Sequence, residues 1–134
     1  MSKSNSTEND VLKMILQGTD PAYRAGANLF LALFTADPTE TGSIADEATY
    51  TSYARVTLPK ASSWTDAGST FSNAALIQFP QCTGGSNLIT HVALITTASG
   101  AGQILYKGAL NSSLTVTNLI QPQFAIAALS ISED

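Results

Sequence analysis

The sequence predicts an all-β protein, a β-sandwich or jelly-roll-like fold that carries one short N-terminal α-helix. Seven runs rich in Val, Ile, Thr, Phe, Tyr and Leu follow one another, and each is bounded by Gly, Pro, Asn, Asp or Ser. No helical period separates these runs, so the alternation typical of parallel βαβ folds is missing. The runs are Leu29–Thr35, Tyr53–Leu58, Ala74–Phe79, Leu88–Thr96, Gln103–Leu110, Leu114–Thr117 and Gln123–Ser132.

The only helical period lies before the first of these runs. Thr7 is the expected N-cap, Asp10 adds negative charge to the first turn, and Gly18 ends the helix. Such a short helix is marginal alone, so its apolar face must pack on its own sandwich or on a partner. Four residues at helical spacing form this face, called here the apolar stripe: Val11, Leu12, Ile15 and Leu16.

The length of 134 residues predicts one domain. Residues 1–6 are polar and are expected to form a flexible arm, whereas residues 7–134 form the single domain. We therefore expect deletion of residues 1–10 to leave a folded sandwich while weakening oligomerisation or attachment to a partner. The stretches 36–52 and 59–73 are long connections, and Asn111-Ser112-Ser113 is expected to be a tight turn.

The composition favours a subunit that stays packed against neighbours. Charged residues are 12% of the chain, against about 25% in an ordinary domain, while there are 16 threonines and 15 serines. A surface covered by hydroxyl groups avoids the free-energy cost of desolvating charges on contact with a partner. We expect such contacts with further copies of the chain, as a dimer or trimer.

Several function classes are disfavoured. The net charge is −4 and the six Lys and Arg residues are scattered, so no basic stripe for nucleic acid is present. The longest apolar run, Leu29–Phe34, is far shorter than the ~20 residues of a membrane span, and the N-terminus lacks the apolar region of a signal peptide. The lone Cys82 excludes an internal disulfide and fits synthesis in a reducing cytoplasm.

Catalytic residues are not assigned. His91 and Cys82 are the only residues of their types, and nothing in the sequence pairs either with a partner for nucleophilic catalysis. Strand alternation places His91 on one face with Ile89, Ala93 and Ile95, so we expect a hydrogen-bonded packing histidine. Cys82 is expected to be a small, partly buried thiol. No phosphate-binding loop is present, and no cofactor is expected.

Acidic residues gather in the stretch 37–47. Their pattern lacks the alternation of a calcium loop, so we assign no metal site and expect a solvated acidic loop facing a basic patch on a partner. Arg55 is expected to pair with one of these carboxylates and fix the loop as a flap. The acidic residues are Asp37, Glu40, Asp46 and Glu47.

Trp64, in SSWTDAG, is the only tryptophan. Three interpretations stay open: an interface anchor, since tryptophan is enriched at interface hot spots, a platform for a sugar ring, and a side chain folded back over the edge of the core. The apolar stripe and Trp64 are the candidate interface residues.

One stretch suggests a family. Residues 29–56 read LFLALFTADPTETGSIADEATYTSYARV, a short apolar strand followed by FTADPT-x-x-G, acidic residues and Y-A-R-V. The later HVALITTASGAGQILYKGAL and the closing FAIAALSISED contribute a strand, a Gly-containing turn and a final apolar strand. This order resembles small tailed-bacteriophage virion proteins, described as tail-fibre-like or head-decoration proteins. The resemblance covers the chain from about Thr7 onward.

The resemblance implies a non-enzymatic virion structural protein. The first expectation is a capsid decoration, or cement, protein on the capsid surface that bridges subunits of the major capsid protein, because the chain lacks the long repeats of a fibre shaft. The alternative within the virion is a tail or tail-fibre-associated structural protein that contacts other virion proteins. The alternative from another class is a carbohydrate-binding β-sandwich module with Trp64 and the acidic loop as its site.

Overall fold

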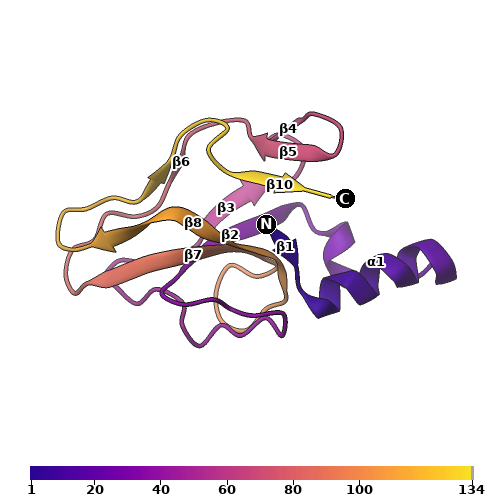
Figure 1. Cartoon of the computed structure of the whole chain (residues 1–134), viewed down its shortest axis with the longest axis horizontal. Coiled ribbons are helices and arrows are strands. Elements are labelled where there is room, and N and C mark those ends of the chain that lie inside the picture. The colour runs from indigo at the N-terminus through magenta and orange to yellow at the C-terminus, as the bar shows by residue number, and fades with distance from the viewer. Residues whose placement is uncertain (134) are drawn as a thin grey trace.

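The computed structural model describes residues 1–133 and is built around one antiparallel five-stranded sheet (Figure 1). A three-stranded and a two-stranded antiparallel sheet accompany it. The helix α1 (Asn5–Gln17) and the 3-10 helix η1 (Ala22–Ala25) precede the second strand. The order in the large sheet is β1 (Ser2–Lys3), β8 (Ile104–Val116), β7 (Asn87–Ile95), β2 (Asn28–Phe34) and β3 (Val56–Pro59). The small sheets are β10 (Ser130–Ser132), β5 (Thr70–Asn73) and β4 (Trp64–Asp66), and β6 (Ile77–Gln78) with β9 (Gln123–Phe124).

The predicted all-β fold with one short N-terminal helix is confirmed. Layers cover both faces of the large sheet, because four consecutive residues of β2, 31–34, are buried. Leu31 and Leu33 pack in the larger apolar cluster with residues of the small sheets, whereas Ala32 and Phe34 pack in a second cluster with Ile44 of the loop after β2. This loop therefore covers the second cluster on one face of the large sheet.

A β-bulge in the pairing of β7 with β8 changes the predicted side-chain alternation of β7. The register shifts between Ile89 and His91, so that Thr90 stands opposite four residues of β8, 110–113. The extra residues lie in β8, and the ladder is interrupted at Thr90. The alternation of β7 is therefore broken at this point, and Ile89 packs with Val92 and Leu94 in the larger cluster and not on the face of His91. The prediction that Ile89 shares a face with His91 is wrong for this reason.

The predicted turn at 111–113 lies within this irregularity of β8 and does not end the strand. The structure has one strand, β8, where the sequence predicts two, because β7 pairs with β8 on both sides of these residues. The predicted long connection 59–73 contains the short strands β4 and β5, and the last predicted run is divided into β9 and β10. Short strands of this kind depend on their partners for stability.

The N-terminus differs from the expected flexible arm. Ser2 and Lys3 pair with β8 as its edge strand, and the helix begins at Asn5 with Ser4 as N-cap, not Thr7. The Ser4 hydroxyl accepts from the Thr7 amide at 3.3 Å and donates to a carbonyl of β8 at 2.5 Å. Deleting residues 1–10 would therefore remove a strand and a helix cap. A loss of attachment after this deletion could not be assigned to a lost partner contact, because the fold itself would change.

A buried ion pair holds the loop after β2. The Nε and Nη2 atoms of Arg55 donate to the two Glu47 carboxylate oxygens, at 2.7 and 2.8 Å, and only 2% of the Arg55 side chain is exposed. Its remaining donors reach Thr97 and the carbonyl of Gly100 in the β7–β8 turn, at 2.8 to 3.0 Å. The prediction that Arg55 pairs with an acidic residue of this loop is confirmed.

Tyr53 joins the ion pair of Arg55 and Glu47 to β2. Its hydroxyl donates to Glu47 at 2.7 Å and accepts from the Leu33 amide of β2 at 3.2 Å. Burial, followed by the hydrogen bond to Glu47, raises the pKa of Tyr53 above its ordinary value of 10.0. The hydrogen bonds to Glu47 also raise the pKa of Arg55, so Tyr53 stays a neutral phenol and Arg55 stays a cation at every physiological pH.

Removing one member of the Arg55–Glu47 ion pair should destabilise the fold strongly. We expect Glu47→Ala to lower the free energy of unfolding by about 3 kcal/mol, because it leaves a buried guanidinium without a counter-charge. The control is Asp20→Ala, which breaks the exposed pair with Arg24 and should cost less than about 0.5 kcal/mol. Urea unfolding followed by circular dichroism measures both, and similar losses in the two variants would contradict the assignment.

Candidate partner-binding surface

Only the first turns of α1 are anchored to the body of the protein. Thr7 is the one buried residue of the helix, and the Asp10 carboxylate accepts from the Gln103 side chain at 2.9 Å. The Asn5 amide donates to the Glu40 carbonyl at 3.0 Å. The helix ends where Gly18 adopts a left-handed conformation (φ 65°) and donates to the Lys13 carbonyl, so the predicted stop at Gly18 is confirmed.

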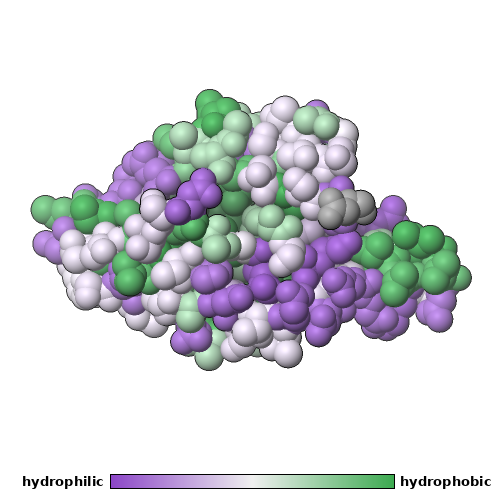
Figure 2. All heavy atoms as spheres, in the orientation of Figure 1, coloured by the Kyte–Doolittle hydropathy of each residue, from purple (hydrophilic) through white to green (hydrophobic). Residues whose placement is uncertain are grey.

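The second half of α1 projects from the body (Figure 1). Of the apolar stripe, Leu12, Ile15 and Leu16 are 56%, 73% and 74% exposed, and Val11 is half-buried. Figure 2 shows apolar residues gathered at the tip where α1 protrudes, next to a strongly hydrophilic surface. The structure thus places the stripe on the surface and not on the sandwich. A contiguous exposed apolar patch of this kind is typical of an interaction site.

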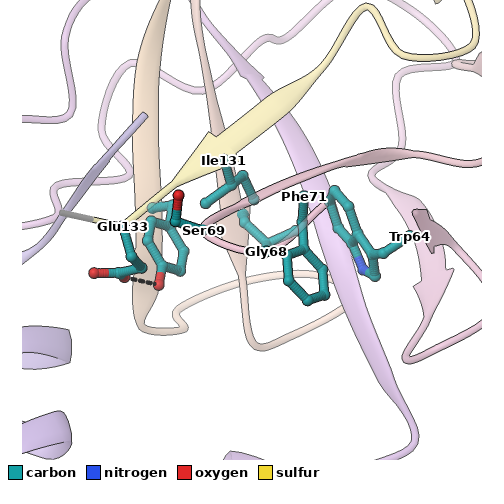
Figure 3. Close-up of a pocket in the computed structure, with 8 residues that line it drawn as sticks. Trp64, Gly68, Ser69, Phe71, Ile131 and Glu133 are labelled. Atoms are coloured by element: carbon teal, nitrogen blue, oxygen red, sulfur yellow. Dashed lines mark hydrogen bonds between the residues drawn. The ribbon is translucent and has the colours of Figure 1, made fainter. Parts of the chain in front are cut away.

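A second apolar feature is a hollow of about 290 Å³ between the three-stranded sheet and the large sheet (Figure 3). The ring of Trp64 lies beside that of Phe71 at one end, and Glu133 lies at the other. This apolar hollow is lined by Trp64, Gly68, Ser69, Phe71, Leu94, Tyr106, Ile131 and Glu133.

The position of Trp64 combines two of its three interpretations. The side chain is half-buried and packs against the larger apolar cluster, as expected of a residue at the edge of the core. It also lines the apolar hollow, which keeps it available as an interface anchor. The other aromatic residues of the hollow, Phe71 and Tyr106, carry no sequence signal of their own, because β5 and β8 meet only in the folded chain.

The two chain ends meet at the hollow. Glu133 binds Lys3 at 2.6 Å and accepts a hydrogen bond from the Tyr106 hydroxyl (Figure 3). The hydrogen bond from Lys3, and then that from Tyr106, lowers the pKa of Glu133. Burial, and then the bond to Glu133, raises the pKa of Tyr106. The ion pair ties the strand β1 to the C-terminal segment.

The acidic loop is not the free acidic surface that the sequence predicts. Lys107 of β8 lies 3.2 Å from Asp37 and 3.4 Å from Glu40, and Glu47 binds Arg55. Three of the four carboxylates are therefore matched by cations of the chain itself, and Asp46 is the exposed exception. Among residues 1–133, no three His, Cys, Asp or Glu side chains gather in the geometry of a metal site.

The histidine and the cysteine lie apart in the structure. The Nδ1 atom of His91 shares a hydrogen bond with the Thr90 hydroxyl at 2.8 Å, and the ring is half-buried. Cys82 is fully buried in the larger cluster, where its thiol donates to the Gly84 carbonyl at 3.1 Å. The thiol is thus more buried than the sequence predicts, and the hydrogen-bonded histidine is confirmed.

The ion pairs at Glu133 and Asp37 should make stability depend on pH. The pKa of Asp37 is lowered by the Thr39 amide and by Lys107, as that of Glu133 is by its partners. Carboxyl groups with a lower pKa in the folded chain than in the unfolded chain contribute stability above their ordinary values of 3.8 and 4.5, and this contribution is lost as the pH falls through the folded values.

We therefore expect Glu133→Gln to flatten the acid limb of the stability curve. Urea midpoints taken between about pH 6 and about pH 2 should fall less steeply in the variant than in the unaltered chain. Asp46→Asn, which removes an exposed carboxylate outside the ion pairs described here, is the control and should keep the original slope. Equal slopes in all three proteins would show that the ion pair at the chain ends adds nothing.

Comparison with known proteins assigns this β-rich chain to a family. No helix among residues 1–133 is both long enough and apolar enough to cross a membrane. A comparison with curated proteins gave no match. The family model described as podophage GP4 fiber I protein gp80 matches residues 2–132, nearly the whole chain. The chain therefore belongs to the podophage GP4 fiber I protein gp80 family, a family of small virion structural proteins of tailed phages.

Proposed function

We propose that this chain is a non-enzymatic structural subunit of the fibre apparatus of a tailed phage, and that the apolar stripe on α1 attaches it to neighbouring protein. The family supports the fibre assignment, because its description names a fibre protein and its match covers residues 2–132. The observation that carries the proposal is the projecting second half of α1, with three large apolar side chains in water.

The physical argument concerns the free energy of those side chains. Complete burial of one Leu or Ile side chain contributes roughly 1.5–3 kcal/mol relative to full exposure. Leu12, Ile15 and Leu16 are already more than half exposed on a formed and capped helix, so little further ordering is needed before they dock. An amphipathic helix that lays its apolar face into a groove is a common mode of protein recognition.

Capsid decoration is the second candidate. The absence of a repeated or coiled-coil shaft within the described chain favours it, as does the hydroxyl-rich composition. Both candidates use the same surface, but they differ in copy number: a decoration subunit follows the capsid lattice, whereas a fibre subunit follows the symmetry of the tail. Quantitative mass spectrometry of purified particles separates the two. Nothing in the geometry favours the carbohydrate-binding alternative, because Ile44 of the acidic loop and Trp64 pack against different apolar clusters and the carboxylates of the loop are mostly paired.

Replacing the stripe should release the chain from the particle. In the triple variant Leu12→Gln, Ile15→Gln and Leu16→Gln, glutamine keeps the helix, since its helix propensity is close to that of leucine. We expect the copies per particle to fall about tenfold or more, which corresponds to about 1.4 kcal/mol of lost binding free energy. The thermal midpoint should stay nearly unchanged, because the replaced side chains are exposed.

The matched control changes three exposed leucines elsewhere on the surface, at positions 76, 88 and 119, which are 50%, 51% and 67% exposed. This triple glutamine variant should enter particles normally. If the stripe variant is incorporated as well as the unaltered chain, α1 is not the attachment element. If the control loses incorporation to the same extent, the effect of the stripe variant is a general one and the proposal fails.

A further inference from the structure

We propose that the occupant facing the apolar stripe is a second copy of this chain, whose apolar hollow receives the tip of α1. This proposal names the protein that covers the stripe. It rests on the proposed function in one respect, because both assign attachment to the apolar stripe. Each copy presents an apolar helix tip without a partner and an unfilled apolar hollow, lined among others by Trp64, Phe71 and Ile131. One chain thus supplies both halves of a contact.

The size and the chemistry of the hollow suit side chains. Its volume of about 290 Å³ is just below the range for ligand pockets, roughly 300–1,000 Å³. Its floor is apolar, and the main charged group at its edge, Glu133, is already bound to Lys3 and Tyr106. Two or three aliphatic side chains from a helix fit such a site better than a polar ligand, which would find few free hydrogen-bonding groups.

The chain cannot fill its own hollow with its own stripe. Hydrogen bonds of Ser4 to Ile104 and of Asp10 to Gln103 fix the first turns of α1 at the start of β8. From there the helix runs outward, away from the sheets that form the hollow (Figure 1). A continuous α-helix does not fold back on itself, so the tip of α1 meets a hollow only on another molecule.

Charge complementarity supports the same pairing. Lys13 lies on α1 directly beside Leu12 and one turn before Leu16, and within residues 1–133 no carboxylate pairs with it. Gly68 lines the hollow, and its amide donates to the Asp66 carboxylate at 2.8 Å, which holds this carboxylate next to the rim. No cation of the described chain pairs with Asp66. Docking of the tip would bring this lysine toward the rim that carries Asp66.

The symmetry of the assembly follows from the two surfaces. The stripe and the hollow are different surfaces, and two arrangements bring them together. Two reciprocal contacts close an isologous dimer, whereas heterologous head-to-tail contacts close a ring such as a trimer. In either case every stripe is covered.

The test measures self-association of the full chain by sedimentation equilibrium. We expect Leu16→Asp in the stripe and Phe71→Lys in the hollow each to raise the dissociation constant about tenfold or more. Ser69→Arg is a second hollow variant at an exposed position, in case Phe71→Lys fails to fold. Leu119→Asp is the control for Leu16→Asp, because this leucine is similarly exposed but lies beside Cys82, away from both surfaces.

A charge exchange tests the direction of docking. Lys13→Glu and Asp66→Lys should each weaken association, and the double variant should regain most of the loss because it restores an opposite-charge pair. The proposal is overturned if the unaltered chain stays monomeric at all accessible concentrations, or if stripe variants weaken association while both hollow variants leave it unchanged.

The outcomes for the two proposals are separable. If the chain is monomeric in solution but the stripe variant is still lost from particles, the second-copy proposal fails and the attachment function stands. If stripe and hollow variants weaken self-association as expected but the stripe variant still enters particles normally, the self-contact stands and the attachment function fails.

Discussion

The ion pair between Arg55 and Glu47 is the interaction on which the arrangement of this protein depends. The loop after β2 belongs to no strand, and beside Glu47 it is joined to β2 through an isolated bridge with Phe34 and the backbone hydrogen bond from the Ala48 amide to the Leu33 carbonyl. One guanidinium connects this loop to the β7–β8 turn through Thr97 and Gly100. Desolvation of the two charges is offset because all five N–H donors of arginine find acceptors, a geometry that lysine cannot reproduce.

Neutral side chains hold the other irregular segments in the same way. The side-chain oxygen of Asn87 accepts from the amides of Thr49 and Tyr50, both at 2.8 Å. Buried Asn73 binds the carbonyls of residues 75 and 125 and the amide of residue 129, at 2.8 to 2.9 Å. A chain with few charges thus keeps its long connections in place with amides and hydroxyls. The tip of α1 lacks such support, which is why it stands out as a surface for another protein.

The sequence predicts those parts whose stability is local or purely apolar. The run Leu29–Thr35 and the stop at Gly18 are recognisable because burial and a left-handed turn need particular residue types. The edge strand at Ser2–Lys3 and the bulge at Thr90 depend on the neighbouring strand and leave no pattern. The stripe on α1 follows from helical spacing, whereas the hollow combines residues from β4, β5, β7, β8 and β10 and appears only once these strands are placed.

The central claim is that neighbouring protein covers the second half of α1 in the virion. A density map of the assembled particle, detailed enough to place side chains, tests this claim most directly. The account predicts that density of another polypeptide lies against Leu12, Ile15 and Leu16 in every copy of the chain. A map in which these three side chains face solvent, while the chain is held in place through other surfaces, would contradict it.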